Sequence, residues 1–270
     1  MTSADFEPWT GLWRLEPDGA PFVSKFGSRL APVRFAGAPA MLKIANGEEE
    51  RRGVAAMAWW AGEGAARVLA WDDPALLLER AEGPRSLAAM ARGGEDDEAM
   101  RILCRCAARL HAPRASPPRS LVPLAVWFQA LAAGASSRGG IFATAWSVAR
   151  ELLASPREER PLHGDLHHDN VLDFGPRGWL AIDPKGLMGE RGFDYANMVC
   201  NPDVETAAAP GALARRARIV CAEAGFEPER YLRWVLAWAG LSATWSLDSG
   251  EDAWRAVAIA RIAAGELGLG

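Results

Sequence analysis

The chain has 270 residues, of which 50% are hydrophobic and 24% charged, and its formal net charge is -4. This balance excludes a disordered chain, and the weakly acidic charge argues against nucleic acid as a principal partner. No apolar run approaches the roughly 18 residues of a membrane span, and no signal peptide is recognisable, so we expect a cytoplasmic protein without a membrane partner. The four cysteines form no C-x-x-C pair, which favours reduced thiols over a metal site.

Residues 9–45 predict a small antiparallel sheet, because short apolar runs alternate with glycine, proline and aspartate. We expect its strands at 13–15, 22–23, 33–35 and 41–44. A turn containing Gly27 and Ser28 separates two of these strands. Its backbone N–H groups either face the phosphates of a nucleotide or close an ordinary hairpin.

One lysine, Lys43, interrupts the apolar run 38–44. This pattern resembles the V-A-I-K strand of kinases, whose lysine reaches the α- and β-phosphates of ATP. The alternative is a lysine on an edge strand that points into solvent. Only Lys25 accompanies Lys43 in this half of the chain, which favours the nucleotide-binding interpretation.

Residues 47–61 predict a helix that begins with three glutamates, which suit the positive end of the helix dipole. One stripe of this helix comprises Glu50, Val54, Met57 and Ala61. We therefore expect Glu50 to orient Lys43, whereas Glu48 and Glu49 point elsewhere. The alternative is a solvated glutamate at the edge of the stripe.

Two further strands are expected at 67–71 and 75–80, with an Asp-Asp-Pro turn between them. The second strand resembles the L-L-L-E-x-x-x-G segment that ends the small lobe of kinase-like enzymes. The resemblance implies that main-chain groups from Glu79 to Ala81 bind the adenine of the nucleotide.

The turn at Gly83-Pro84 predicts a lobe boundary, with an N-lobe at 1–83 and a mostly helical C-lobe at 84–270. In the C-lobe, helices are expected at 86–109, 124–132 and 141–154. A break at 93–97 interrupts the first of these helices. The Gly/Ser-rich segment 134–140 predicts a flexible link beside the substrate cleft.

A later apolar stripe predicts a long core helix near the end of the chain. The stripe comprises Tyr231, Trp234, Trp238, Leu241 and Trp245. Aromatic stripes usually pack in a core, and Trp245 is the member that we expect to reach a cleft.

The clearest chemical signal is the stretch 162–170, L-H-G-D-L-H-H-D-N. Asp165 and Asn170 have the spacing of the catalytic aspartate and the metal-binding asparagine in the kinase H-R-D-L-x-x-x-N loop. Two short apolar runs around a Gly-Pro turn separate Asn170 from Asp183, which predicts a hairpin. Because a hairpin brings its open ends together, we expect Asn170 and Asp183 to hold Mg²⁺ side by side. Carboxylates that merely cap a helix would explain only one of these three groups.

The segments HGDLHHDN and LAIDPKGLMGERGFDYANM resemble the aminoglycoside/hydroxyurea antibiotic resistance kinases, and the streptomycin 6-phosphotransferases in particular. These enzymes lie within the aminoglycoside phosphotransferase, protein-kinase-like superfamily. The resemblance implies an α+β fold with two protein-kinase-like lobes. It also implies ATP-dependent phosphorylation of a small-molecule hydroxyl, with ATP and Mg²⁺ as cofactors. The metal segment is I-D-P rather than D-F-G and no activation segment follows, which argues against a regulated protein kinase.

By the same resemblance, Asp165 accepts the proton of the acceptor hydroxyl, and Asp194 supports the catalytic loop unless it is a plain N-terminal helix acid. His167 occupies the position of a protein-kinase lysine, from which an imidazole would donate to the γ-phosphate. Lys185 remains open, because it either contacts phosphate or pairs with Glu190.

Streptomycin carries two guanidinium groups, so a cleft with carboxylates is expected for it. The candidates are Asp203, Glu205, Asp248, Glu251 and Asp252, although acids at helix ends are usually just solvated. Three functions stay open: an aminoglycoside 6-phosphotransferase, a kinase for hydroxyurea or another small metabolite, and a nucleotide-binding scaffold without catalysis. We expect a monomer or a small homo-oligomer.

Overall fold

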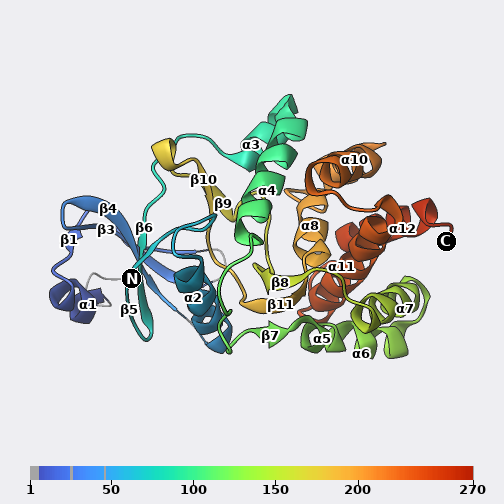
Figure 1. Ribbon diagram of the computed structural model, residues 1–270, viewed down its shortest axis with the longest axis horizontal. Helices are drawn as coiled ribbons and strands as arrows, with labels where there is room; N and C mark the ends of the chain where they lie inside the picture. Colours follow the sequence, from blue (N-terminus) through green and yellow to red (C-terminus); the bar gives the residue numbers. More distant parts are fainter. Residues whose placement is uncertain (1–5, 25–26, 46, 270) are drawn as a thin grey trace.

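The computed structural model describes residues 6–24, 27–45 and 47–269 (Figure 1). Its N-terminal part is a six-stranded antiparallel sheet in the order β1-β3-β4-β6-β5, with β2 paired to β3. The strands are β1 (Glu16–Pro17), β2 (Phe22–Val23), β3 (Arg29–Phe35), β4 (Ala38–Ile44), β5 (Val68–Asp72) and β6 (Ala75–Glu79). Strand β4 pairs with β3 on one side and β6 on the other, so its residues lie inside the sheet.

A short helix, α1 (Glu7–Leu12), precedes the sheet, and the strand predicted at 13–15 is wrong. Pro8 lies in the first turn of α1, where its missing N–H removes no helical hydrogen bond. Trp9 and Trp13 pack against an apolar cluster on one face of the sheet, formed with residues such as Leu42 and Ile44. Trp13 was therefore misassigned to a strand, because a tryptophan that covers a sheet has the same apolar pattern in the sequence as a strand residue.

Helix α2 (Glu48–Trp60) connects the sheet to the C-terminal part. Strand alternation directs Lys43 to the face opposite Leu42, toward α2. At the other end of α2, Trp60 is fully buried and its Nε1–H donates to Leu110 O at 3.0 Å. Ala61, expected on the inward stripe, is instead the exposed C-cap with a left-handed backbone. The apolar core runs on from α2 into the C-terminal part, and the lobe boundary at residue 83 stays a prediction.

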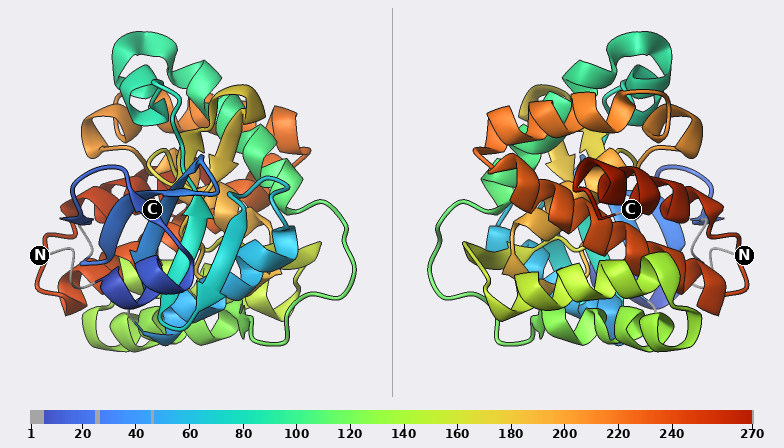
Figure 2. Two further views of the ribbon diagram at one scale, coloured as in Figure 1. Left: turned by 90° about the vertical axis from the view of Figure 1, so that its left-hand side faces the viewer. Right: turned by 90° about the vertical axis from the view of Figure 1, so that its right-hand side faces the viewer.

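The C-terminal part packs its helices around α11 (Pro228–Asp248), which contacts α6, α7, α8, α10 and α12. Figure 2 shows α11 and α12 beside α6 and α7, on the side of the molecule away from the N-terminal sheet. The other helices are α3 (Leu87–Met90), α4 (Asp96–Leu110), α5 (Leu124–Trp127), α6 (Gln129–Arg138), α7 (Gly140–Ala154), α8 (Gly192–Val199), α9 (Val204–Ala207), α10 (Ala212–Ala224) and α12 (Trp254–Glu266). Within the described ranges, none of these helices has the length and apolarity to cross a bilayer.

Short strands flank the stretch 162–170, between the N-terminal sheet and the helices. Strand β8 (Glu159–Leu162) pairs with β11 (Leu187–Glu190), which also pairs with β7 (Val122–Pro123). Between β8 and β11 lies the antiparallel hairpin of β9 (Val171–Asp173) and β10 (Trp179–Ala181), which is the hairpin expected from the sequence.

The Gly/Ser-rich segment 134–140 is not a flexible link, because α6 continues to Arg138 and α7 begins at Gly140. A Cβ on Gly134 would lie 2.9 Å from the side chain of Thr244 on α11, so this glycine permits two helices to approach closely. The break predicted at 93–97 is real but small. A π-helical turn at Ala91–Glu95 joins α3 to α4, and Gly94 takes a positive φ of 96° there.

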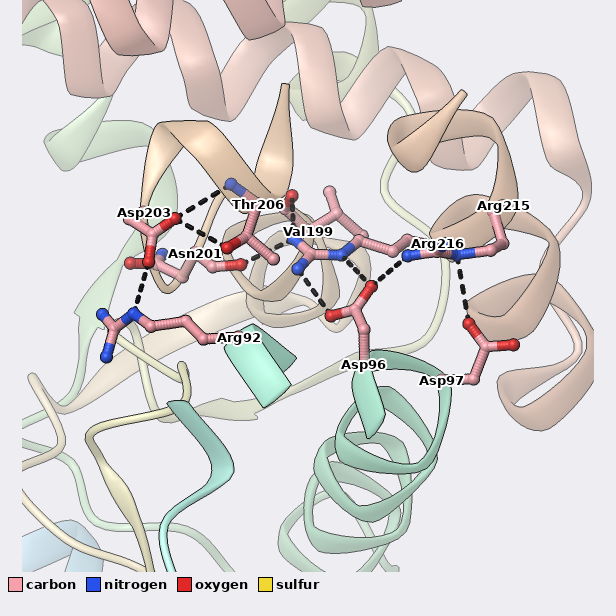
Figure 3. A network of polar contacts seen from close by, with 9 residues as sticks. All are labelled: Arg92, Asp96, Asp97, Val199, Asn201, Asp203, Thr206, Arg215 and Arg216. Atoms are coloured by element: carbon pink, nitrogen blue, oxygen red, sulfur yellow. Dashed lines mark hydrogen bonds and ion pairs between the residues drawn. The ribbon is translucent and has the colours of Figure 1, made fainter. Parts of the chain in front are cut away.

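A buried ion pair joins α4 to α10 (Figure 3). Arg216 is fully buried, and its guanidinium makes two hydrogen bonds to Asp96, at 2.6 and 2.9 Å. Its remaining Nη1 donates to the carbonyls of Val199 and Asn201. The arginine thereby fixes the end of α8 and the loop after it against the rest of the helical part.

Candidate active site

The side chain of Asp165 lies in the loop 163–170, which connects β8 to β9. Asn197 Nδ2 donates to Asp165 Oδ1 at 3.1 Å, and Asn170 Nδ2 donates to Oδ2 at 3.2 Å. His167 Nε2 is 3.6 Å from Oδ1. Both carboxylate oxygens are therefore oriented by neighbours, and the predicted catalytic pair Asp165 and His167 lies together.

The loop 163–170 is anchored by Asp194, a fully buried carboxylate on α8. Its oxygens accept the backbone N–H groups of His163 at 2.8 Å and Gly164 at 2.7 Å. His111 Nε2 is 2.8 Å from the same carboxylate. Asp194 therefore supports the loop through backbone hydrogen bonds, as the family resemblance implied, and His111 at the end of α4 fixes Asp194.

The hairpin brings Asn170 next to Asp183, as its spacing predicted. Ile182 N–H donates to Asn170 O at 2.9 Å, and His163 Nε2 lies 2.7 Å from Ile182 O. Asp183 has a φ of +58°, in the left-handed region that residues other than glycine rarely occupy. Such a conformation costs about 1–3 kcal/mol and is concentrated at functional sites. His163 therefore connects the loop of Asp165 to the segment that precedes Asp183 and orients the two relative to each other.

Lys43 joins the sheet, α2 and the hairpin. Its Nζ is 3.1 Å from Glu50 Oε1 and 2.7 Å from Asp183 Oδ1, and its side chain is only 7% exposed. Ser28 Oγ donates to Glu50 Oε1 at 2.7 Å. The alternatives of a solvent-facing edge-strand Lys43 and a solvated Glu50 are both wrong, because the residues meet inside the cleft.

A cavity of about 90 Å³ lies between these groups, with Lys43, Glu50, Asp165, Asn170 and Asp183 among its lining residues. The turn at Gly27 and Ser28 closes one side of it: Gly27 N–H donates to Ser24 O at 3.0 Å, and Ser24 and Ser28 line the cavity. Ser28 N–H donates to Ser24 Oγ at 3.1 Å, so both N–H groups are used within the turn, and the phosphate contact expected of them stays a prediction.

The predicted adenine-binding segment is the end of β6. The Glu79 side chain is engaged inside the protein, since its Oε1 accepts the Arg67 N–H at 2.6 Å and pairs with Arg177. Ala81 is half-buried and packs against the core. The Glu79 N–H donates to Arg67 O and the Arg80 N–H to Pro39 O, whereas no hydrogen bond among the described residues uses the Ala81 N–H. The adenine contact expected of this segment stays a prediction.

A second cavity, of about 590 Å³, opens on the other side of Asp165. Its walls carry three tryptophans, Trp127 from α5 and Trp238 and Trp245 from α11. Trp127 and Trp245 meet edge to face with their ring centroids 5.1 Å apart. Trp245 reaches the cleft as predicted. Trp127 was missed, because α5 is a four-residue helix too short for a periodic signal.

A third cavity, of about 460 Å³, shares Trp238 with the second. Of the five candidate carboxylates, Asp203, Glu251 and Asp252 line this third cavity. Asp248 instead pairs with Arg138 at 2.7 Å, and Glu205 is an exposed residue of α9. Only part of the predicted acidic set therefore faces a cavity.

The charge of Asp165 is fixed by its surroundings. Burial alone would raise the pKa of this carboxyl, but the hydrogen bond and charge of His167 and the charge of Lys185 lower it well below its ordinary value. Burial lowers the pKa of His163, and it lowers that of His168 to about 3. At neutral pH, Asp165 is thus an ionised acceptor, and the buried imidazoles of His163 and His168 are neutral.

The oxygen donors fit Mg²⁺ only in partnership with phosphate. Asn170 Nδ2 donates to Asp165 O at 2.8 Å, which directs the amide oxygen of Asn170 away from the loop. Across residues 6–24, 27–45 and 47–269, no group of three or more His, Cys, Asp or Glu side chains is arranged to hold a metal. Mg²⁺ is typically bound by one or two protein oxygens, with phosphates and water completing its shell. The side-chain oxygens of Asn170 and Asp183 would supply this small number of protein ligands.

Sequence reasoning missed two features of the site. Asn197 on α8 binds Asp165, and its only signal is its position three residues after Asp194. Glu49, expected to point away, is 2.9 Å from Lys185 Nζ. The alternative partner of Lys185, Glu190, pairs with Arg230 and is excluded.

Comparison with known proteins agrees with this architecture. Residues 12–250 match the family of aminoglycoside/hydroxyurea antibiotic resistance kinases. A streptomycin 3''-kinase of Klebsiella pneumoniae is 56% identical over 243 residues, which cover 88% of this chain and 91% of that protein. A hydroxyurea phosphotransferase of Kitasatospora aureofaciens is 32% identical (95% and 77% covered), and a streptomycin 6-kinase of Streptomyces griseus is 36% identical (67% and 61%).

Among solved structures, an aminoglycoside phosphotransferase in ternary complex with ADP and hygromycin B superposes with a TM-score of 0.67. The two sequences are 14% identical, and the match covers 100% of both chains. This likeness confirms the predicted α+β, protein-kinase-like fold. The family match covers most of the chain and confirms the predicted phosphotransferase class. The chain belongs to the aminoglycoside/hydroxyurea antibiotic resistance kinases.

Proposed function

We propose that the protein transfers the γ-phosphoryl group of ATP to the 3''-hydroxyl of streptomycin. The observation that carries this proposal is the position of Asp165, which lines both the polar cavity and the tryptophan-walled cavity. A phosphotransferase needs a carboxylate where its donor and acceptor meet, because positioning of the two substrates supplies much of the catalysis.

The donor side is the polar cavity. Lys43, fixed by Glu50, contacts the α- and β-phosphates, and the turn that contains Gly27 and Ser28 covers the phosphates, with Ser24 and Ser28 lining the cavity. Main-chain groups from Glu79 to Ala81 bind adenine. Mg²⁺ held by Asn170 and Asp183 offsets negative charge on the phosphates when the nucleotide is bound.

The acceptor hydroxyl donates a hydrogen bond to Asp165, which aligns the hydroxyl oxygen with the γ-phosphorus. Because the pKa of Asp165 is low, the carboxylate is a weak base that takes the proton late, after most of the phosphoryl group has been transferred. This order suits phosphoryl transfer, whose transition state is loose and demands little proton removal. His167, at 3.6 Å from Asp165, supplies a hydrogen-bond donor toward the transferred group.

The acceptor side is the tryptophan-walled cavity and the third cavity behind Trp238. Planar cations bind over tryptophan faces, and carboxylates pair with guanidinium groups through two parallel hydrogen bonds. Streptomycin has two guanidinium groups, and Glu251 and Asp252 stand at the far wall. A volume of about 590 Å³ beside Asp165 is far larger than hydroxyurea requires, which favours an aminoglycoside.

The 3''-hydroxyl is proposed in place of the 6-hydroxyl that the sequence motifs suggested. The support is the degree of similarity: 56% identity to the 3''-kinase against 36% to the 6-kinase. The shared motifs bind ATP and metal in both kinds of enzyme and do not distinguish acceptor hydroxyls.

The test is ADP release in the presence of Mg²⁺ and ATP, with streptomycin, hydroxyurea and other aminoglycosides as acceptors. We expect streptomycin-dependent turnover, with the phosphate located by tandem mass spectrometry on the ring that carries the 3''-hydroxyl. Phosphate on the guanidinium-bearing ring would return the assignment to the 6-hydroxyl. Turnover with hydroxyurea alone would overturn the aminoglycoside acceptor.

A further inference from the structure

Lys185 lies where the two substrate cavities meet. It lines both the polar cavity of Lys43 and the tryptophan-walled cavity. Its Nζ is 2.9 Å from Glu49 Oε1 on α2, and its side chain is 29% exposed. Of the 30 basic residues in the chain only three are lysines, namely Lys25, Lys43 and Lys185. Lys25 lies outside the described residues, and both of the others are in the site.

The backbone beside Lys185 is wedged between α2 and the catalytic loop. Lys185 N–H donates to His163 O at 2.6 Å. A Cβ on Gly53 would lie 2.0 Å from Pro184 O, and a Cβ on Gly164 would lie 2.9 Å from Lys185 Cβ. On the other flank, a Cβ on Gly186 would lie 2.8 Å from the backbone of α2. Three glycines therefore permit this close packing, and the backbone from which the Lys185 side chain extends is held in place.

The ion pair with Glu49 does not by itself account for this arrangement. Both side chains are partly exposed, and pairs of this kind stabilise a folded protein by roughly 0–1 kcal/mol. A lysine ammonium is a compact point charge with three donors, whereas arginine presents a planar fork. Among the described residues, the other exposed ion pairs use arginine, whereas a lysine lies here, where the two cavities share lining residues.

We propose that Lys185 is a further catalytic residue, whose ammonium contacts the γ-phosphoryl group during its transfer, and that Glu49 positions it. This inference rests on the proposed function. In the transfer, the bond from the γ-phosphorus to the β,γ-bridging oxygen breaks, and a bond to the acceptor oxygen forms. The hydroxyl proton passes to Asp165, ADP leaves, and Lys185 stays protonated throughout. A donor fixed toward the equatorial oxygens contributes most in the transition state.

The decisive variants are Lys185→Met, which keeps the apolar stem, Lys185→Arg, and Glu49→Gln. Removing one fixed donor to transition-state charge typically lowers kcat about 10²–10³-fold. We expect that loss for Lys185→Met, with the KM for ATP and for streptomycin within about threefold of wild type and an unchanged Tm. Glu49→Gln keeps the ammonium of Lys185 but removes the carboxylate that positions it, so kcat should fall about tenfold. The matched control is Arg51→Met, which removes an exposed cation of α2 that pairs with Asp73.

A second measurement needs no acceptor. We expect ADP and Mg²⁺ to bind the wild-type enzyme more tightly when aluminium fluoride mimics the transferred group, and Lys185→Met should abolish that tightening while ADP alone binds as before. Retention of the tightening, a kcat within threefold of wild type, or a loss of Tm that explains the lost activity would each overturn the role of Lys185. Failure of wild-type enzyme to phosphorylate streptomycin would overturn the proposed acceptor instead, and the fluoride measurement would still decide the role of Lys185.

Discussion

Two sets of charged side chains join distant parts of this chain, and they differ in how completely they are satisfied. In the helical part, Arg216 is fully buried and makes four hydrogen bonds, two to Asp96 and two to backbone carbonyls (Figure 3). In the cleft, Lys43 meets Glu50 and Asp183, but the side chain of Asp183 is 43% exposed and its backbone is left-handed. One set is closed to any ligand, and the other faces a cavity.

The difference separates charges that stabilise the fold from charges that serve chemistry. A buried arginine with its donors satisfied has no capacity left for a substrate, and its loss leaves an uncompensated charge. In the cleft, Lys43, Glu50 and Asp183 pair with one another, and these ion pairs fix the side chains before a nucleotide binds. Mutations in the two regions should therefore separate activity from stability.

The largest expected effect is in the cleft. Asp165→Asn keeps the shape of the side chain but removes the charge and the proton acceptor, so kcat should fall about 10²–10⁴-fold. The free energy of unfolding should also fall, because the surroundings that lower the pKa of Asp165 favour its charged form in the folded protein. Both quantities are measured on one preparation, by ADP release and by urea unfolding.

The control is Asp169→Asn, an exposed carboxylate four residues away on the same loop. It should leave both kcat and stability near wild type. If Asp165→Asn keeps more than a tenth of the wild-type kcat, Asp165 is not the proton acceptor. The charged residues of the cleft would then have only a structural role.

The cleft could be predicted from the sequence to the extent that it depends on local spacing. The interval from Asn170 to Asp183 encodes a hairpin, and a hairpin fixes which residues lie side by side. Lys43 was likewise found locally, because it interrupts an apolar run in the pattern of the kinase V-A-I-K strand. Its partner Glu50 was found because a helical stripe is also local.

Contacts between distant elements could not be predicted in this way. Glu49 was expected to point away from the inward face of α2, but the segment after Asp183 packs against that helix, and Lys185 pairs with Glu49. Gly134 looked like part of a flexible link, whereas it permits close packing against Thr244. Composition cannot distinguish a glycine that bends the chain from one that lets two helices touch. The closed network of Arg216 gave no sequence signal at all.

The next effect in size is on stability. Arg216→Met should lower the free energy of unfolding by about 3–5 kcal/mol, because Asp96 is left buried with its main partner removed. The kcat of the folded variant should stay within about twofold of wild type. Replacing the partner as well, in Asp96→Leu with Arg216→Met, should recover most of the stability, since no buried charge then remains. An Arg216→Met protein as stable as wild type would show that the network contributes little.

The pH dependence of the same variant provides an internal check. Burial would raise the pKa of Asp96, but the hydrogen bonds and charges of Arg216 and Arg215 lower it below its ordinary value. A lowered folded-state pKa contributes stability that is present above the unfolded pKa of about 3.9 and lost as the pH falls. Without Arg216 that pKa rises. The stability gap between wild type and Arg216→Met should therefore be widest near neutral pH and narrow below about pH 4.

The smallest effect is expected at a separate, exposed ion pair near the Arg216 set, between Arg92 and Asp203. Arg92 Nε donates to Asp203 Oδ2 at 2.6 Å, but the arginine side chain is 55% exposed, so Arg92→Ala should cost less than about 1 kcal/mol of unfolding free energy. Asp203 also accepts two hydrogen bonds from Thr206, which keep its carboxylate in place at the wall of the third cavity. Without Arg92, the carboxylate of Asp203 keeps its position but is no longer neutralised by a cation. It can therefore pair with a guanidinium group of the substrate. The KM for streptomycin should fall by up to about threefold while the KM for ATP is unchanged, and initial rates over both substrates measure this. A raised streptomycin KM would instead place Arg92 itself among the acceptor-binding groups.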